Sequence, residues 1–281
     1  MPSLSDWNYF IRPNLIIPTL AIYLIGYLSS KNSLFDLNFY LGGIIATLMY
    51  AASITINHYF DYKWDKKSKD LYRFPIARGS FSRKFALNFT VLLIILALVF
   101  SFRLSSLSLT IVILGIFWLF AYSAPPLRIK TKPFLEIFWN GVGYGFFPFY
   151  LALSTLNFSL NLEMVLLSLI PFCVVASGHV LLQVPDIQTD RKTKQTTTNA
   201  LYGKQFAVKL SRALIGFAGL IIFYLWYVGF LNYLALVSLG FGTLIFAMHK
   251  RLRKLKDVRK AFKALQVAYV VGGILFILSI I

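Results

Sequence analysis

Two short acidic clusters are the features of this chain that could do chemistry. The first consists of Asn57, Asp61 and Asp65 and the second of Asp186 and Asp190, each member four residues after the one before it. The clusters hold four of the ten Asp and Glu residues in a chain of 281. Residues four apart share one face of a helix, so each cluster presents its side-chain oxygens together. Oxygen ligands arranged in this way can share a hard divalent cation.

The cation expected at such clusters is Mg²⁺, bound together with a phosphorylated substrate. Mg²⁺ typically takes one or two carboxylates, keeps several waters and accepts phosphate oxygens, so two such sites predict a clamp for a diphosphate. Four carboxylates balance two Mg²⁺ ions, and a diphosphate therefore needs cations from Lys or Arg. The candidates for diphosphate binding are Lys63, Arg73, Arg78, Arg128, Lys130, Arg191 and Lys194.

An alternative is that these Asp side chains are solvated loop charges that pair with neighbouring Lys residues. For a single pair beside basic residues, that alternative would be favoured. Both clusters, however, directly follow long apolar segments, and an Asn leads the first one. Carboxylates near a bilayer are costly to bury and tend to be functional, so the pattern favours a binding site.

The composition is that of a polytopic membrane protein. Apolar residues make up 58% of the chain and charged residues 14%, and the mean hydropathy is +0.71. Soluble domains carry about 25% charged residues. A net charge of +18 could indicate a nucleic-acid partner. The charges, however, fall in short loops between apolar segments, so we expect no such partner. The N-terminal sequence has no basic region or cleavage motif of a signal peptide, and the single cysteine, Cys173, allows no internal disulfide.

Nine apolar stretches reach the roughly 20 residues that a membrane-spanning helix needs. We therefore predict a single all-α domain over residues 1–281, a bundle of nine transmembrane helices in the lipid bilayer. The stretches are 14–30, 38–59, 84–102, 106–124, 134–155, 162–184, 205–228, 230–248 and 265–281.

The distribution of basic residues supports this topology and predicts its orientation. If the N-terminus and the loops after the second, fourth, sixth and eighth helices share one side, all of the 28 Lys and Arg except Lys31 and Arg103 lie there. By the positive-inside rule that side is cytoplasmic, and the C-terminus lies opposite. Both acidic clusters then lie on the cytoplasmic side, after the second and sixth helices.

These motifs together resemble those of the UbiA-type intramembrane prenyltransferases. That family carries N-x-x-x-D-x-x-x-D after its second helix and D-x-x-x-D after its sixth, which match the two clusters. The segment from Pro75 to Gly79 is similar to the family's R-P-(I/L)-x-x-G stretch, and the segment from Tyr122 to Lys130 to its Y-(S/T)-x-P-x-x-(R/K)-x-K loop. Thr197 and Gly203 also fall where the family has Thr and Gly.

The resemblance implies a nine-helix bundle that transfers a prenyl group from an allylic polyprenyl diphosphate with the help of two Mg²⁺ ions. It implies that Asp61 and Asp190 are catalytic among the metal ligands, and that the Tyr122 ring stabilises the allylic cation. It also implies that segments 61–80 and 186–203 cap the site against water. The chain departs from the family at Phe74, which separates Arg73 from Pro75, at Gln188 where an acid is frequent, and at Lys194 in place of Gly. Which of Arg73 and Arg78 binds the diphosphate stays open. The same holds for Arg128 and Lys130.

The acceptor is less constrained than the donor. An aromatic quinone precursor is the most frequent acceptor in the family, and the alternative is a non-aromatic lipid such as a carotenoid or a glycerophosphate ether lipid. His179 and Gln183 precede the second cluster on one helical face and, with Asn140, are candidates for an acceptor pocket. A cation-coupled transporter is the alternative of another class, but its carboxylates would lie near the membrane midplane at broken helices.

Overall fold

The computed structural model describes residues 2–30, 36–67, 70–156, 160–192, 195–252 and 258–281. Within these ranges all regular structure is helical, which confirms the predicted all-α class. The helices form two compact units, which we describe in turn. The first comprises Met1–Tyr27, Ser33–Lys130 and Phe147–Phe158, and the second Leu28–Asn32, Thr131–Phe146 and Ser159–Ile281.

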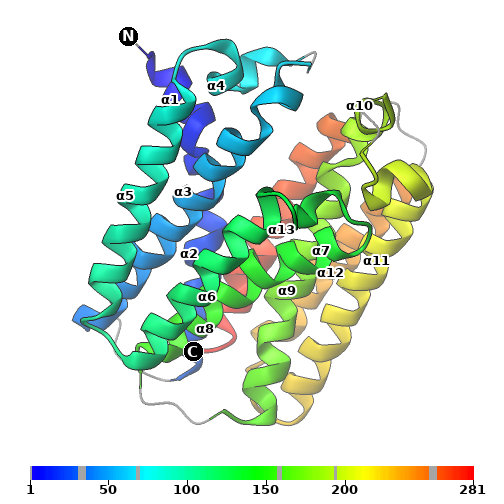
Figure 1. The fold of residues 1–281 in the computed structure, drawn as a ribbon. Helices are drawn as coiled ribbons and strands as arrows, with labels where there is room; N and C mark the ends of the chain where they lie inside the picture. The colour runs from blue at the N-terminus through cyan, green and yellow to red at the C-terminus, as the bar shows by residue number, and fades with distance from the viewer. Residues whose placement is uncertain (1, 31–35, 68–69, 157–159, 193–194, 253–257) are drawn as a thin grey trace. The chain divides into compact units, whose positions relative to one another are not determined.

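The first unit is organised around α3, the long helix that carries the first acidic cluster. Figure 1 shows α3 beside α5, and α3 also contacts α1, α4, α6 and α8. Twelve of its residues are buried, as expected of a helix that packs against several others. The helices of this unit are α1 (Leu4–Ile11), α2 (Ile16–Ser29), α3 (Leu37–Asp65), α4 (Pro75–Arg78), α5 (Arg83–Ser101), α6 (Ser106–Ser123) and α8 (Phe147–Ser154).

Short polar side chains define where these helices begin. Ser3 and Asp6 form a reciprocal capping box at the start of α1, in which each side chain accepts a hydrogen bond from the other's backbone N–H. The side chain of Ser82 accepts the backbone N–H of Phe85 at the start of α5. Gly79 ends α4 in the left-handed conformation, with φ of 91°. These residues therefore set the start of α1, the end of α4 and the start of α5.

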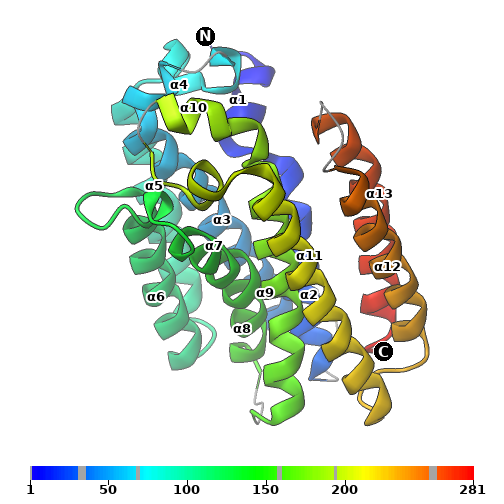
Figure 2. The ribbon, with the colours of Figure 1, turned by 90° about the vertical axis from the view of Figure 1, so that its right-hand side faces the viewer.

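The second unit packs α9 against α11 and α12 against α13 (Figure 2). Asn232, before α12, donates its backbone N–H to Ser279 and its side-chain amide to the carbonyl of Leu278, so α12 and α13 run antiparallel. The helices of this unit are α7 (Leu135–Asn140), α9 (Leu162–Leu182), α10 (Ile187–Lys192), α11 (Thr198–Tyr227), α12 (Leu234–Leu252) and α13 (Val258–Leu278).

Two glycines permit the irregular helical segments of this unit. A π-helical turn, Gly141–Phe146, follows α7, and a Cβ added at Gly145 would lie 2.7 Å from the Cα of Phe172 on α9. Only a glycine allows the two backbones to approach this closely. Gly203 adopts φ of 78° and ψ of 176° and kinks α11 after its first turns.

Six helical stretches in the described ranges are long and apolar enough to cross a membrane. They are Leu4–Ser29, Leu37–Asp65, Arg83–Ser101, Ser106–Ser123, Leu162–Lys192 and Thr198–Tyr227, and two shorter apolar helices are Leu234–Ile245 and Val267–Leu278. The predicted span at 134–155 corresponds to α7, the π turn and α8 in succession. The number of nine spans therefore stays a prediction.

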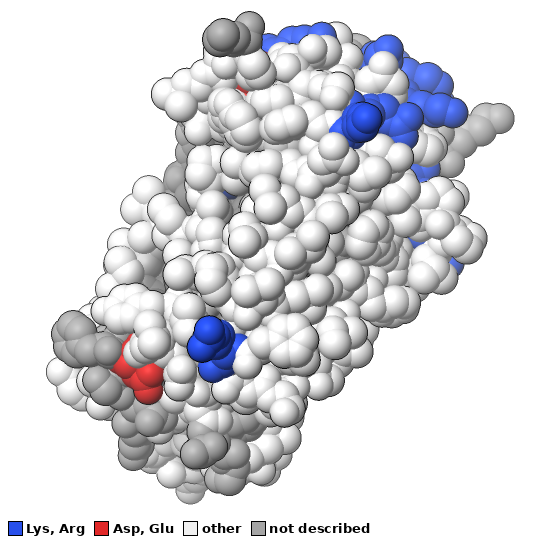
Figure 3. All heavy atoms as spheres, turned by 60° about the vertical axis from the view of Figure 1, so that its left-hand side comes forward, with Lys and Arg blue, Asp and Glu red and all other residues white. Residues whose placement is uncertain are grey.

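The surface of α5 has the character expected of a helix in lipid. In Figure 3, Lys and Arg side chains gather at one end of the visible face, and a wide uncharged region separates them from a small charged patch at the other end. Arg83 and Lys84 begin α5, and Arg103 follows its end. The exposed large side chains between them are Phe85, Val91, Leu92, Ile95, Val99 and Phe102. An apolar belt between charged ends is typical of a membrane-facing helix.

Candidate active site

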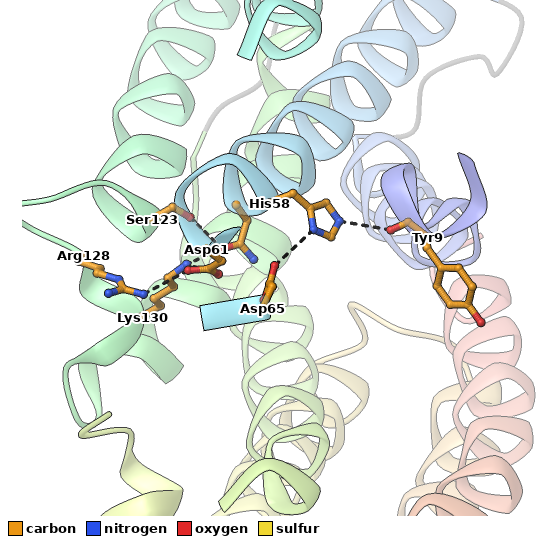
Figure 4. A network of polar contacts seen from close by, with 8 residues as sticks. Tyr9, His58, Asp61, Asp65, Ser123, Arg128 and Lys130 are labelled. Carbon is orange, nitrogen blue, oxygen red and sulfur yellow. Dashed lines mark hydrogen bonds and ion pairs between the residues drawn. The ribbon is translucent and has the colours of Figure 1, made fainter. Parts of the chain in front are cut away.

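The first acidic cluster lies on the last turns of α3. This helix continues without interruption to Asp65, as the sequence predicts, so Asn57, Asp61 and Asp65 follow one another at helical spacing. Figure 4 shows Asp61 directed toward Arg128 and Lys130, and Asp65 directed toward His58. Asp61 therefore faces two basic side chains, whereas Asp65 faces a histidine.

Lys130 lies against two oxygens of this cluster. Its Nζ donates to Asn57 Oδ1 at 2.6 Å and forms an ion pair with Asp61 Oδ2 (Figure 4). The Lys130 side chain is only 10% exposed. Burial lowers the pKa of Lys130, and the negative charge of Asp61 acts in the opposite direction. Asn57 and Asp61 thus already surround a cation.

Arg128 makes the second cationic contact with Asp61. Its Nη2 lies 3.2 Å from Asp61 Oδ1, and its guanidinium carbon lies 3.4 Å from the centre of the Trp64 ring. Stacking on an aromatic ring holds a guanidinium in place at little desolvation cost. Both candidates of this loop for diphosphate binding, Arg128 and Lys130, therefore contact the first cluster.

The end of α6 adds a hydroxyl group to the same site. Ser123 Oγ donates to Asn57 Oδ1 at 3.2 Å (Figure 4). Tyr122 precedes it, partly buried, and its ring stacks on Trp118 with the centroids 6.1 Å apart and the planes 14° apart. The predicted catalytic ring is thus next in sequence to a residue that contacts the cluster.

His58 joins the far side of the cluster to the N-terminal helix. Its Nδ1 lies 3.9 Å from Asp65 Oδ2, and its Nε2 lies 3.2 Å from the carbonyl oxygen of Tyr9 (Figure 4). His58 is buried, with 3% of its surface exposed. Mg²⁺ prefers oxygen ligands, so this buried imidazole suits a packing role between α3 and α1 better than a metal-binding one.

The donor set of the first cluster fits Mg²⁺ better than a metal held by protein alone. In the part of the chain that the structure describes, no three His, Cys, Asp or Glu side chains converge on one point. The oxygens of Asn57 and Asp61 instead converge on the ammonium of Lys130. Mg²⁺ needs few protein ligands because water and substrate phosphates complete its octahedron. The residues present therefore suit an ion that arrives with a phosphorylated substrate.

The second acidic cluster is built differently from the prediction. We expected Asp186 and Asp190 to extend the preceding helix and to share a face with His179 and Gln183. Instead α9 ends at Leu182, Asp186 ends a 3-10 turn and is exposed, and Asp190 lies on α10. Pro185 lacks an N–H and cannot continue the helical hydrogen bonds, which explains the break.

Asp190 is positioned by the start of α11. The hydroxyl of Thr197 donates to Asp190 Oδ2 at 3.0 Å, while the same side chain caps α11 by accepting the N–H of Ala200. Arg191 turns away toward α11, where its Nε donates to the carbonyl of Ala200 at 2.7 Å. Lys194 lies outside the described residues. The described residues of this segment thus anchor the second cluster to α11.

A buried polar network that includes Glu136 lies behind the second cluster, and the sequence analysis missed this glutamate. Glu136 on α7 is fully buried and accepts the backbone N–H of Thr198 at 2.7 Å and the Gln183 amide at 3.2 Å. The available signal was a single carboxylate inside an apolar stretch, which is costly unless it is paired. Glu136 therefore joins the ends of α7, α9 and α11.

The three acceptor-pocket candidates are brought together in this network. His179 Nε2 lies 2.9 Å from Gln183 Nε2 and 3.3 Å from Asn140 Nδ2. Asn140 also donates to the carbonyl of Glu136 at 2.9 Å. Two amide donors at Nε2 place the proton of a neutral His179 on Nδ1. The three side chains therefore form one cluster, and their role in an acceptor pocket stays a prediction.

Of the remaining diphosphate candidates, Arg73 and Arg78 lie in the loop after α3, whereas Lys63 lies on the last turn of α3 itself. Arg73 pairs with Asp70 at 3.8 Å on the surface. Arg78 forms an ion pair with Asp6 on α1 and donates to Ser80. Lys63 is exposed and lines a small pocket beside Arg128.

Comparison with known proteins defines the class of this all-helical fold and its acidic motifs. The UbiA prenyltransferase family matches residues 15–280, and the chain belongs to this family. It is a prenyltransferase and an integral membrane protein, as the motifs predict.

The similar curated proteins include enzymes of lipid and of aromatic prenylation. A digeranylgeranylglyceryl phosphate synthase of Methanobrevibacter smithii is 28% identical over 97% of this chain and 97% of its own length. A 2-acyl-4-prenylphloroglucinol 6-prenyltransferase of Humulus lupulus is 26% identical over 73% of this chain and 53% of its own length.

Solved structures share the fold. A UbiA homologue from Archaeoglobus fulgidus bound to DMAPP and Mg²⁺ superposes with a TM-score of 0.75 at 18% identity, covering 98% of this chain and 99% of the homologue. That protein was solved with the class of donor and the ion that the acidic clusters of this chain predict.

Proposed function

We propose that this prenyltransferase transfers a polyprenyl group from an allylic diphosphate to a hydroxyl of a glyceryl phosphate ether lipid in a Mg²⁺-dependent reaction. The donor half of this proposal depends on one observation, the convergence of Asn57 and Asp61 oxygens on a cation. The acceptor half is supported by relatives named digeranylgeranylglyceryl phosphate synthase, one of which aligns over 97% of both chains. Two further relatives carry the same name.

Each acidic cluster holds one Mg²⁺ ion in this proposal. Asn57, Asp61 and Asp65 would hold the first ion, and Asp186 and Asp190 would hold the second. Bound Mg²⁺ supplies charge neutralisation of the leaving diphosphate. Lys130 and Arg128 then exchange Asp61 for phosphate oxygens, which they bind as charge-assisted donors.

The group transfer forms one bond and breaks another. The acceptor oxygen bonds to C1 of the prenyl group while the bond from C1 to the diphosphate oxygen breaks, and the hydroxyl proton passes to the released diphosphate. The Tyr122 ring faces the electron-poor prenyl carbon, because an aromatic face stabilises positive charge. Segments 61–80 and 186–203 keep water away, since water would trap the same carbon.

The orientation in the membrane forms part of the proposal. The N-terminus and both acidic clusters lie on the cytoplasmic side of nine spans, and the C-terminus lies opposite. The gathering of basic side chains at one end of the face in Figure 3 is consistent with this positive-inside orientation. A water-soluble diphosphate head would thus be bound at the membrane surface, with the prenyl tail in the hydrocarbon.

An aromatic acceptor is the second candidate, favoured by the relative from Humulus lupulus. It would need an electron-rich ring carbon instead of a hydroxyl as nucleophile. We place it second because that relative aligns over 53% of its own length, whereas the archaeal synthase aligns over 97%.

The deciding experiment is a competition between acceptors. Purified protein would receive labelled geranylgeranyl diphosphate, Mg²⁺ and equal amounts of geranylgeranylglyceryl phosphate and 4-hydroxybenzoate, and products would be identified by mass spectrometry. We expect the glyceryl phosphate diether, and we expect EDTA to abolish it. Exclusive prenylation of 4-hydroxybenzoate would overturn the acceptor, and undiminished turnover in EDTA would overturn the metal dependence.

A further inference from the structure

A small basic pocket lies beside the first acidic cluster and within the first unit. Its volume is about 210 Å³. It touches the cluster through two shared residues, because Ser123 bonds to Asn57 and Arg128 bonds to Asp61. The lining residues are Phe60, Tyr62, Lys63, Trp64, Arg83, Ser123, Pro125 and Arg128.

The charge of this pocket is strongly positive. Three of its lining side chains are cationic, and none of the described residues that line it is acidic. Arg128 shares its charge with Asp61, but Lys63 and Arg83 form no ion pair with a carboxylate in the described ranges. Lys63 and Arg83 therefore leave about two positive charges unbalanced in the pocket. This charge favours a ligand with about two negative charges.

Aromatic rings hold the basic groups in position. The Arg83 guanidinium lies 4.6 Å from the Tyr59 ring centre and 5.4 Å from that of Tyr62, and Arg128 stacks on Trp64. Stacking leaves the N–H groups of the Arg83 guanidinium at the edge of the rings, where they can bind a phosphate bidentately. The pocket therefore has fixed donors and not only exposed charge.

We propose that this pocket binds the phosphate monoester of the glyceryl phosphate acceptor, separately from the donor diphosphate. The inference rests on the proposed function for the identity of the acceptor. A phosphate monoester carries a charge near −2 at pH 7, which matches Lys63 and Arg83. The shared residues Ser123 and Arg128 place the acceptor headgroup next to the first acidic cluster. The aromatic side chains Phe60 and Trp64 would contact the glycerol and the start of its chain.

A direct binding measurement tests the pocket without turnover. The probe is dihexanoyl phosphatidic acid, a soluble glycerolipid phosphate monoester, titrated calorimetrically into the full-length protein in detergent without Mg²⁺ or donor. We expect Arg83→Gln to weaken binding at least about tenfold and Arg83→Lys to weaken it less. Arg103→Gln, beyond the other end of α5, is the control with equal charge loss and should bind like the wild type. Equal binding by wild type and Arg83→Gln, with both variants folded by their melting temperatures, would overturn the proposal.

Kinetics in neutral phosphatidylcholine nanodiscs identify the source of the phosphate. If the pocket binds the acceptor, Arg83→Gln raises the acceptor KM at least about tenfold and leaves the donor KM unchanged. Phosphatidic acid added to the nanodisc then competes with the acceptor. Activation by phosphatidic acid with an unchanged acceptor KM would assign the pocket to bilayer headgroups and overturn our proposal. Absence of any turnover with glyceryl phosphate would refute the proposed function, and the calorimetry would still decide whether the pocket binds phosphate.

Discussion

The two acidic clusters share a four-residue spacing but differ in how the chain builds them. The first lies on an uninterrupted helix, and its Asp61 and Asp65 side chains are 19% and 14% exposed. The second is divided by a helix break between a 3-10 turn and a short helix, and its Asp186 is exposed. The same sequence pattern therefore produces partly buried carboxylates on one helix in the first unit, and one exposed and one partly buried carboxylate on separate elements in the second.

The difference also extends to the groups that stabilise each cluster. Cationic side chains from one loop, Lys130 and Arg128, hold Asp61. A neutral hydroxyl, that of Thr197, holds Asp190, and a buried glutamate orders the helix ends behind it. Mg²⁺ carries the same charge as Lys130 and Arg128 together, so it could replace both at Asp61 with little change in local charge. Side-chain cations therefore hold the first cluster in place before a ligand binds, whereas a neutral hydroxyl holds Asp190 of the second.

The largest effect is expected at the first cluster. Asp61→Asn removes one charge from the oxygens that surround the cation, and we expect kcat to fall about a thousandfold because Mg²⁺ catalysis supplies several kcal/mol. Asp186→Asn should cost less, because its side chain is exposed and water can replace it. Steady-state kinetics over a Mg²⁺ titration would compare the two variants.

The control for both substitutions is Glu163→Gln, in the first turn of α9 and outside either cluster. It should retain wild-type kcat. Equal losses in Asp61→Asn and Asp186→Asn would remove the distinction that we draw between the clusters.

Replacing Lys130 sharpens the comparison through metal affinity. Lys130→Met removes the ammonium that contacts Asn57 and Asp61, and we expect kcat/KM for the donor to fall about a hundredfold. The oxygens are then free, so Mg²⁺ alone should raise the Tm of Lys130→Met more than that of the wild type. Differential scanning fluorimetry with and without Mg²⁺ measures this, and Lys130→Arg is the charge-preserving control. A smaller Mg²⁺ shift in Lys130→Met would show that lysine does not occupy the metal position.

The buried glutamate behind the second cluster should affect stability more than metal binding. Glu136→Gln places an amide where the carboxylate accepts the N–H of Thr198 and the Gln183 amide, so one donor loses its partner. A buried unsatisfied donor costs about 1–3 kcal/mol. Hydrogen exchange at the start of α11 should therefore become faster, while the Mg²⁺ dependence of turnover changes little. A large rise in the Mg²⁺ requirement without faster exchange would instead place Glu136 in the metal site.

Much of the first cluster could be predicted from the sequence, because helix periodicity alone determines its geometry. An apolar run with no Pro or Gly between Ile44 and Asp65 indicates one continuous helix, and the structure has it. The Arg128 and Lys130 alternatives followed from motif likeness, and both side chains reach Asp61. The helical class and the family also followed, since composition and motif spacing are local properties of the chain.

The rest depends on contacts between segments that are distant in sequence. Pro185 disfavours a continuous helix, but the 3-10 turn that separates His179 from Asp186 was not predicted. The role of Glu136 depends on Thr198, 62 positions away. The partner of Arg78 is Asp6, 72 positions away, which no motif in the loop indicates. Side-chain pairing of this kind is set by tertiary packing and not by local pattern.

The smallest effects are expected in the loop after α3, where they decide between two arginines. Among the described residues, Arg73 forms an exposed ion pair with Asp70 alone. Such pairs contribute about 0–1 kcal/mol, so Arg73→Gln should leave activity and Tm nearly unchanged. Arg78 joins the α4 loop to α1 through Asp6, so Arg78→Gln should loosen the proposed cap and lower kcat severalfold. The donor KM and kcat of both variants test whether Arg78 matters more than Arg73. Arg78→Lys is the charge-preserving control. A larger increase of the donor KM in Arg73→Gln would mean that Arg73 leaves Asp70 to bind the diphosphate, and the ion pair seen here would then be a ligand-free arrangement of the same residue.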